Sequence, residues 1–180
     1  MAEPPRALKI EQRPEQIDNP VLRFYLDYWE RKRAGRTMPS RADIRASELK
    51  PHIGAMVLLE ALPGRQDFKY RLVGTRVSEV FLADATGLTL RQAYARAGAS
   101  QEFTDSVVRT HRIVCEKRVP IRITGGHGEW RGRFYPAYDA LYLPLSDDGV
   151  EANMVLNVCT FTPRSVDVAD DMTHAVVPVT

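Results

Sequence analysis

The chain has 180 residues, enough for one domain whose hydrophobic core needs no metal ion or disulfide to stabilise it. Hydrophobic residues make up 44% of the sequence and the formal net charge is +2, which excludes a disordered chain and gives no indication of nucleic-acid binding. No apolar run of 18 residues is present and the N-terminus lacks an apolar core, so we expect neither a membrane span nor a signal peptide. A cytoplasmic protein is therefore the default, and in that reducing compartment we expect Cys115 and Cys159, which lie far apart and form no CxxC motif, to be free buried thiols.

The N-terminal third begins with a segment rich in proline and charge. Residues 1–16 contain three prolines, and we expect them to form a flexible tail. Asn19 can cap a helix and Pro20 suits the first helical position, which predicts a helix over 18–33. An irregular connection follows over residues 34–54, with one short helix near its end.

The predicted helix carries apolar residues at three- and four-residue spacing, so it presents an aromatic stripe along one side. The stripe consists of Leu22, Tyr25, Tyr28 and Trp29. An isolated amphipathic helix is marginal in water, so the stripe needs a cover, either the parent domain or the same helix of a second copy. We predict a homodimer in which these four side chains form much of the interface.

Strands and short helices alternate in the rest of the chain. We predict strands at 55–61, 68–73, 119–124, 129–145 and 152–161. Helices are expected between the second and third of these strands, the longest over 101–118 after Ser100 as its cap. Because hairpins join most of the strands, the pattern predicts an α+β fold with a five-stranded antiparallel sheet and helices on one face.

Several short motifs strengthen this prediction. They are Asn19-Pro20, Tyr28-Trp29, Gly35-Arg36, residues 39–44 (PSRADI), residues 68–75 (FKYRLVGT), Thr86-Gly87 and residues 143–149 (LPLSDDG). In this order and spacing they resemble a PAS-like family of small bacterial proteins, the fifth PAS class. The family tends to have glycine before its Asp-x-Thr-Gly turn, where this chain has Leu82-Ala83.

The resemblance implies a five-stranded antiparallel sheet in which the helices between the second and third strands close a small pocket. It also implies a sensory or protein-interaction role and supplies no catalytic residue. We therefore divide the chain into a tail (1–16), an N-terminal helix and connection (17–54), a PAS-like core (55–162) and a C-terminal tail (163–180).

The motifs of common enzyme classes are absent or incomplete. His127-Gly128-Glu129 would supply half of a zinc deaminase signature, but two distant cysteines cannot supply the other half. There is no HExxH, no GxSxG and no phosphate-binding lysine loop. The Asn-Cys-Arg-Phe motif of flavin-binding PAS domains is also absent. We expect no catalytic residue, no metal ligand and no bound cofactor.

One histidine lies on the apolar side of the helix at 101–118. Phe103, Val107 and His111 follow one another at steps of four, so His111 should face the sheet. Three roles are open: a core-edge histidine with a hydrogen-bonded ring, a haem ligand as in haem-binding PAS domains, or a polar contact to another ligand in the pocket.

The candidate pocket residues come from the predicted strands at 68–73 and 129–145 and from the helices expected between the second and third strands. They are Leu72, Phe81, Tyr94, Phe103, Val107, His111, Tyr138 and Tyr142. The strand around 134–145 does not alternate cleanly, so its inward face stays open.

We expect a non-catalytic sensory or signalling module that binds a small ligand or a signalling protein and acts by contact with another protein. The alternatives are an interaction adaptor with a filled core and a small-molecule enzyme that uses the α+β cavity.

Overall fold

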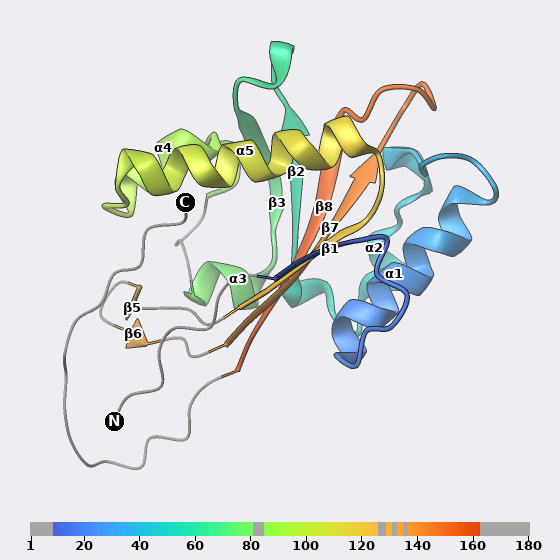
Figure 1. The fold of residues 1–180 in the computed structure, drawn as a ribbon, viewed down its shortest axis with the longest axis horizontal. Helices are drawn as coiled ribbons and strands as arrows, with labels where there is room; N and C mark the ends of the chain where they lie inside the picture. The colour runs from blue at the N-terminus through green and yellow to red at the C-terminus, as the bar shows by residue number, and fades with distance from the viewer. Residues whose placement is uncertain (1–8, 81–84, 126–128, 131–132, 135–136, 163–180) are drawn as a thin grey trace.

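The computed structural model describes residues 9–80, 85–125, 129–130, 133–134 and 137–162. A six-stranded antiparallel sheet forms its centre, with the strand order β1-β4-β7-β8-β2-β3 (Figure 1). Its strands are β1 (Lys9–Gln12), β2 (Met56–Ala61), β3 (Phe68–Val73), β4 (Ile121–Gly125), β7 (Ala137–Leu145) and β8 (Met154–Thr162). β5 (Glu129–Trp130) and β6 (Arg133–Phe134) pair separately. The five predicted strands are therefore present. The strand predicted at 129–145 corresponds to β7, which begins at Ala137 rather than at residue 129.

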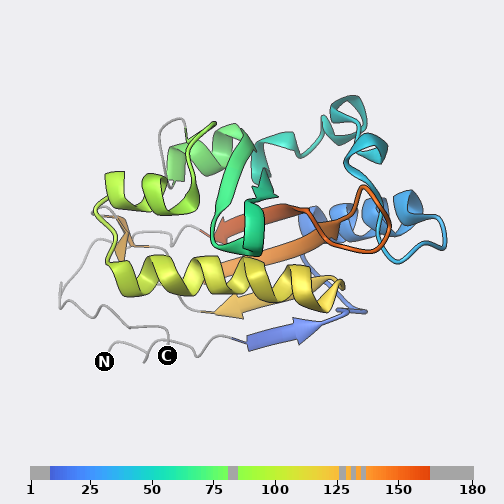
Figure 2. The same ribbon diagram turned by 90° about the horizontal axis from the view of Figure 1, so that it is seen from above.

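The sixth strand corrects the expectation of a flexible tail over residues 1–16. Lys9–Gln12 form β1 and pair with β4 at the edge of the sheet, as Figure 2 shows. The Arg13 amide continues this contact by donating to the Pro120 carbonyl over 2.8 Å. Ile10 is 63% exposed, so the strand has no buried face to impose apolar alternation on its sequence. Its pairing partner alone distinguishes it from a tail.

Helices pack on both faces of the sheet. They are α1 (Pro20–Arg33), α2 (Ala46–Leu49), α3 (Thr75–Val80), α4 (Leu90–Arg96) and α5 (Gln101–Lys117). Short 3-10 turns lie at Arg41–Asp43, Ile53–Ala55 and Pro63–Arg65. In Figure 1 the strands separate α1 from α4 and α5, so the N-terminal helix covers the face opposite the other long helix.

The helix starts follow the local chemistry of the sequence. The Asn19 side chain accepts hydrogen bonds from the amides of Val21 and Leu22, with Pro20 in the first turn. Thr89 opens α4 through a capping box with Gln92, and the Ser100 hydroxyl caps α5. These caps satisfy amides that have no partner within the helix, and those at Asn19 and Ser100 confirm the predicted starts of α1 and α5.

The aromatic stripe of α1 is covered by the same chain. Leu22 and Tyr25 are 0% exposed, Tyr28 is 1% and Trp29 is 2%. The Trp29 indole donates to the Pro144 carbonyl of β7 over 2.8 Å. This burial corrects the prediction that these four side chains form a dimer interface, because they already pack inside one chain.

Tyr28 also fixes the connection that follows α1. Its hydroxyl donates to the Glu48 carboxylate over 2.8 Å and accepts from the Arg45 amide over 2.9 Å. The Tyr25 hydroxyl donates to the His52 carbonyl over 3.1 Å. The irregular segment between α1 and β2 is therefore held by the helix, and one hydrophobic core includes both parts.

The pairing of β7 shows which of its side chains face each layer. β7 and β8 pair without a register shift from Ala137 to Leu145. Asp139 lies on the face of α1, because the Asn19 amide donates to its carboxylate over 3.3 Å. Tyr142 lies on the face of α5, where its ring contacts His111. Tyr138, two positions earlier, shares that face.

Candidate ligand-binding site

A cluster of aromatic and polar side chains fills part of the space between the sheet and helices α4 and α5. We call it the tyrosine–histidine cluster; it consists of Phe68 and Tyr70 from β3, Tyr94 from α4, His111 from α5, Tyr138 and Tyr142 from β7, and Asn157 and Cys159 from β8. Its members come from distant parts of the chain. The sheet register brings Tyr142 opposite Asn157, so the two strands at the centre of the sheet supply the floor.

Hydrogen bonds link most of the polar groups of the cluster to one another. The hydroxyls of Tyr138 and Tyr142 lie 2.8 Å apart, and Tyr142 also bonds to Asn157. The Cys159 thiol donates to the Asn157 side-chain carbonyl over 2.7 Å. Tyr70 and Tyr94 share a hydrogen bond on the other side of the cluster.

Burial keeps these groups neutral. Desolvation raises the pKa of Tyr70, Tyr94, Tyr138 and Tyr142 well above the ordinary value of a phenol. The same cause raises the pKa of the Cys159 thiol to about 12. Near neutral pH the cluster therefore presents uncharged hydroxyl, thiol and amide groups, each able to take part in hydrogen bonds.

His111 is the exception among these partnered groups. It is 3% exposed, and its ring lies 5.3 Å from that of Phe68 and 5.2 Å from that of Tyr142. Nδ1 donates to the Val107 carbonyl over 2.8 Å, which leaves Nε2 as the acceptor nitrogen. Nε2 is buried and has no hydrogen-bond partner among the residues that the structure describes. A buried acceptor without a partner costs about 1–3 kcal/mol, so this atom needs an explanation.

The environment of His111 predicts a pH-dependent stability. Desolvation lowers its pKa from 6.5 to about 4, partly offset by the Val107 hydrogen bond and by the charge of Asp67; Tyr142, which also packs on the ring, stays neutral. Below pH 6.5 the unfolded chain binds a proton that the folded chain does not, so stability falls as the pH falls through this window. We expect this residue to account for a loss of about 2 kcal/mol between pH 7 and pH 5.

Chemical denaturation of the wild type and of a His111→Gln variant at both pH values measures this contribution. The carboxylates titrate in both proteins and cancel in the difference. Equal pH dependence of the two proteins would show that His111 is protonated as easily in the folded state as in the unfolded state.

The structure brings together half of the predicted pocket residues. Tyr94, His111, Tyr138 and Tyr142 all belong to the cluster. Phe103 adjoins it, with its ring edge-on to Tyr94 at 5.6 Å.

Of the other three predicted residues, two belong to the described part of the chain, and neither adds its side chain to the polar groups of the cluster. Val107 takes part through its backbone carbonyl, as the partner of the His111 ring. Leu72 pairs with Leu58, in the row of β2 that faces α1, because a register shift separates it from Tyr70. Phe81 lies outside the described residues.

Sequence reasoning missed four members of the cluster: Phe68, Tyr70, Asn157 and Cys159. The alternation of β3 contained a signal for the first two, since Phe68 and Tyr70 share its apolar face. Asn157 and Cys159 carry no such signal. Only the pairing of β8 with β7 places them beside the tyrosines.

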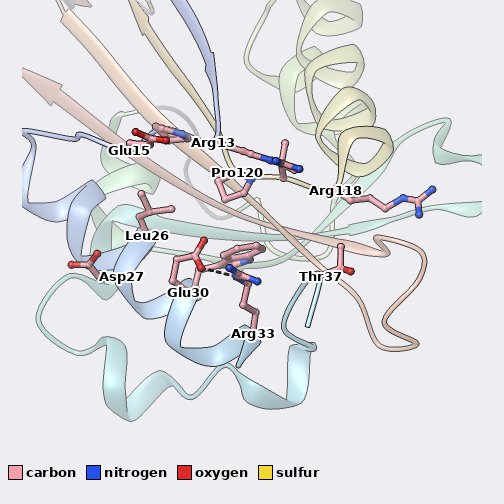
Figure 3. A pocket seen from close by; sticks show the side chains of 12 residues that line it. Arg13, Glu15, Leu26, Asp27, Glu30, Arg33, Thr37, Arg118 and Pro120 are labelled. Carbon is pink, nitrogen blue, oxygen red and sulfur yellow. Dashed lines mark hydrogen bonds and ion pairs between the residues drawn. The ribbon is translucent and has the colours of Figure 1, made fainter. Parts of the chain in front are cut away.

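A concave region lies on the other side of the sheet from the cluster. It is a groove of about 630 Å³ between the C-terminal half of α1 and the segments 13–15 and 118–120 (Figure 3). Leu26, Trp29 and Pro120 contribute apolar surface. The charged side chains that line it are Arg13, Glu15, Asp27, Glu30, Arg33 and Arg118, three of each sign. With its charges balanced, the groove has no bias towards a small anion or cation.

The described residues contain no group of three or more histidine, cysteine, aspartate or glutamate side chains placed to hold a metal ion. Within the same part of the chain, none of the helices has the length and apolar character needed to cross a bilayer.

The arrangement defines a class of protein. In the described part of the chain, helices α3, α4 and α5 lie in sequence between the second and third strands of the five-stranded core. Helices α4 and α5 cover the polar aromatic cluster on one face of the sheet. The sequence resemblance implies this arrangement for a PAS-type module. The model of the PAS domain family matches residues 17–159, and the chain belongs to this family. The match includes α1 and the connection as well as the core, and it begins after β1. Searches of curated proteins and of solved structures found no match.

Proposed function

We propose that this chain is a sensory module that binds a small molecule in the tyrosine–histidine cluster and passes the signal to another protein by contact. The unpartnered Nε2 of His111 carries this proposal. Buried acceptors in folded proteins normally have a hydrogen-bond partner, and a bound ligand that donates a hydrogen bond would supply the partner of this one. Membership of the PAS family supports a sensory or interaction role. The two free cysteines support a cytoplasmic location.

The pKa values of the cluster support a binding role over a catalytic one. A general acid or base works best when its pKa lies near the working pH. Here burial moves the pKa of His111 down to about 4 and the pKa values of the four tyrosines up. Each group is therefore held in its neutral form, suited to recognition rather than to proton transfer.

A protein-interaction adaptor is the second candidate, and the groove beside α1 favours it. Its apolar surface with charges of both signs along the rim resembles the mixed composition of protein interfaces more than a small-molecule site. In this case binding would take place on the face of α1, and the cluster would be a structural core.

Native mass spectrometry of the full chain distinguishes the two candidates. We expect the chain mass increased by that of a small molecule that co-purifies. The homodimer also stays a prediction, but its interface would have to use a surface other than the four covered side chains of α1. We expect no haem mass and no haem absorption band. A spectrum that contains the bare chain alone, under conditions that keep non-covalent ligands bound, would favour the adaptor.

A further inference from the structure

We propose that the ligand is a neutral aromatic molecule that donates an O–H or N–H hydrogen bond to Nε2 of His111. This inference rests on the proposed function and adds the chemical class of the ligand. It follows from the tautomer of one imidazole, from the hydrogen bonds of its neighbours and from the rings that enclose it.

The tautomer of His111 determines what its free nitrogen can accept. A backbone carbonyl only accepts hydrogen bonds, so the 2.8 Å contact between Nδ1 and the Val107 oxygen requires the proton on Nδ1. Nε2 then carries a buried lone pair without a hydrogen-bond partner among the described residues, on a side chain that is 3% exposed. A matching ligand must donate at this position.

The neighbouring side chains do not satisfy this lone pair. The Tyr142 hydroxyl is bonded to Tyr138 and to Asn157, although its ring lies against that of His111. The Asn157 carbonyl in turn accepts from the Cys159 thiol. No donor among the described residues reaches Nε2, and we infer that a bound ligand supplies it.

Charge and shape narrow the class of ligand. A carboxylate or phosphate would place its negative charge against a lone pair, in a cluster whose phenols are already neutral because of desolvation. Asp67 is the charged group that acts on His111, and one of its oxygens already accepts from the Phe68 amide over 2.8 Å. The rings of Phe68 and Tyr142 pack against the His111 ring, so the surroundings of Nε2 are aromatic and favour an aromatic ligand. A phenol or an indole combines such a ring with a donor.

Nitrogen NMR of the full chain with ¹⁵N-labelled histidine tests the proposal directly, with phenol, benzene and benzoate as probes. We expect phenol to move the Nε2 resonance of His111 towards that of a hydrogen-bonded acceptor, in a saturable manner. The resonances of His52, whose ring packs on Phe24 away from the cluster, should stay unchanged and serve as an internal control. Phenol should bind roughly five- to tenfold more tightly than benzene, the ratio that one net hydrogen bond provides. Benzoate should bind more weakly than either.

A His111→Phe variant keeps an aromatic ring and removes the acceptor. In this variant the preference for phenol over benzene should fall to about one, whereas it should persist in His52→Phe. The wild-type spectra alone decide the matter if the His111 variant does not fold.

Three results would overturn the proposal. An Nε2 resonance already in the hydrogen-bonded position without probe, and unmoved by phenol, identifies a trapped water as the donor. Equal affinity for phenol and benzene with an unmoved Nε2 leaves the sensory function standing and removes the ligand class. Absence of any binding by the probes, with no small molecule in the native mass spectrum, removes both.

Discussion

Replacing Trp29 by alanine is expected to lower the free energy of unfolding by about 3–5 kcal/mol, the range for a large aromatic side chain lost from a core. Trp29 is 2% exposed, and its indole nitrogen donates to the Pro144 carbonyl. The alanine variant therefore leaves a cavity between α1 and the sheet and a backbone acceptor without its partner. Denaturant unfolding followed by circular dichroism measures the change.

Two variants serve as controls for this prediction. Trp29→Phe keeps most of the ring and removes the indole donor, so its cost should be clearly smaller. Ile113→Ala removes an apolar side chain that is 39% exposed on α5 and should change stability by less than about 1 kcal/mol. A Trp29→Ala midpoint close to that of Ile113→Ala would mean that α1 contributes little to the stability of the domain.

The second large effect is expected at Gly74, between β3 and α3. A Cβ atom at this position would lie 2.4 Å from the Gly54 carbonyl oxygen and 2.5 Å from that of Ile53. Both are backbone atoms, and the Gly74 amide is itself bonded to the Met56 carbonyl over 2.8 Å. Neither the backbone at Gly74 nor that at Ile53–Gly54 can move without disrupting the start of β2. Gly74→Ala should therefore lower the free energy of unfolding by about 3 kcal/mol or more.

Gly54→Ala is the matched control, because it adds a methyl group at the same contact from the opposite side. Its Cβ would meet Thr75 Oγ1 at 3.0 Å and Arg76 Cγ at 3.3 Å, which are side-chain atoms that can rotate away. We expect a cost of about 1 kcal/mol or less. Thermal unfolding of both variants checks the difference, and equal melting temperatures would contradict the close backbone approach at Gly74.

Trp29 and Gly74 differ in how much of their structural role the sequence predicts. The burial of Trp29 follows from the spacing of the stripe on α1, whereas the choice of its cover does not. Gly74 belongs to a motif that resembles the PAS family, but its φ angle is not in the left-handed region and no turn demands glycine there. Its requirement arises from a segment 20 residues earlier in the chain, at Gly54.

The sequence by itself determined the local features of this protein. The caps at Asn19, Thr89 and Ser100, the apolar stripe of α1 and the inward position of His111 all result from contacts within about four residues, which composition and spacing reveal directly. The α+β class and the order of strands and helices follow from the same short-range patterns.

Only the tertiary structure decided how these elements combine. The addition of β1 to the sheet, the cover of α1 by its own domain and the placement of Asn157 and Cys159 beside the tyrosines each depend on pairing between segments far apart in the chain. Such pairing is selected by the packing of the whole core, since the backbone hydrogen bonds of a strand are the same for any partner. The unpartnered nitrogen of His111 also depends on the tertiary structure, because the lack of a hydrogen-bond partner can be recognised only when the positions of the surrounding side chains are known.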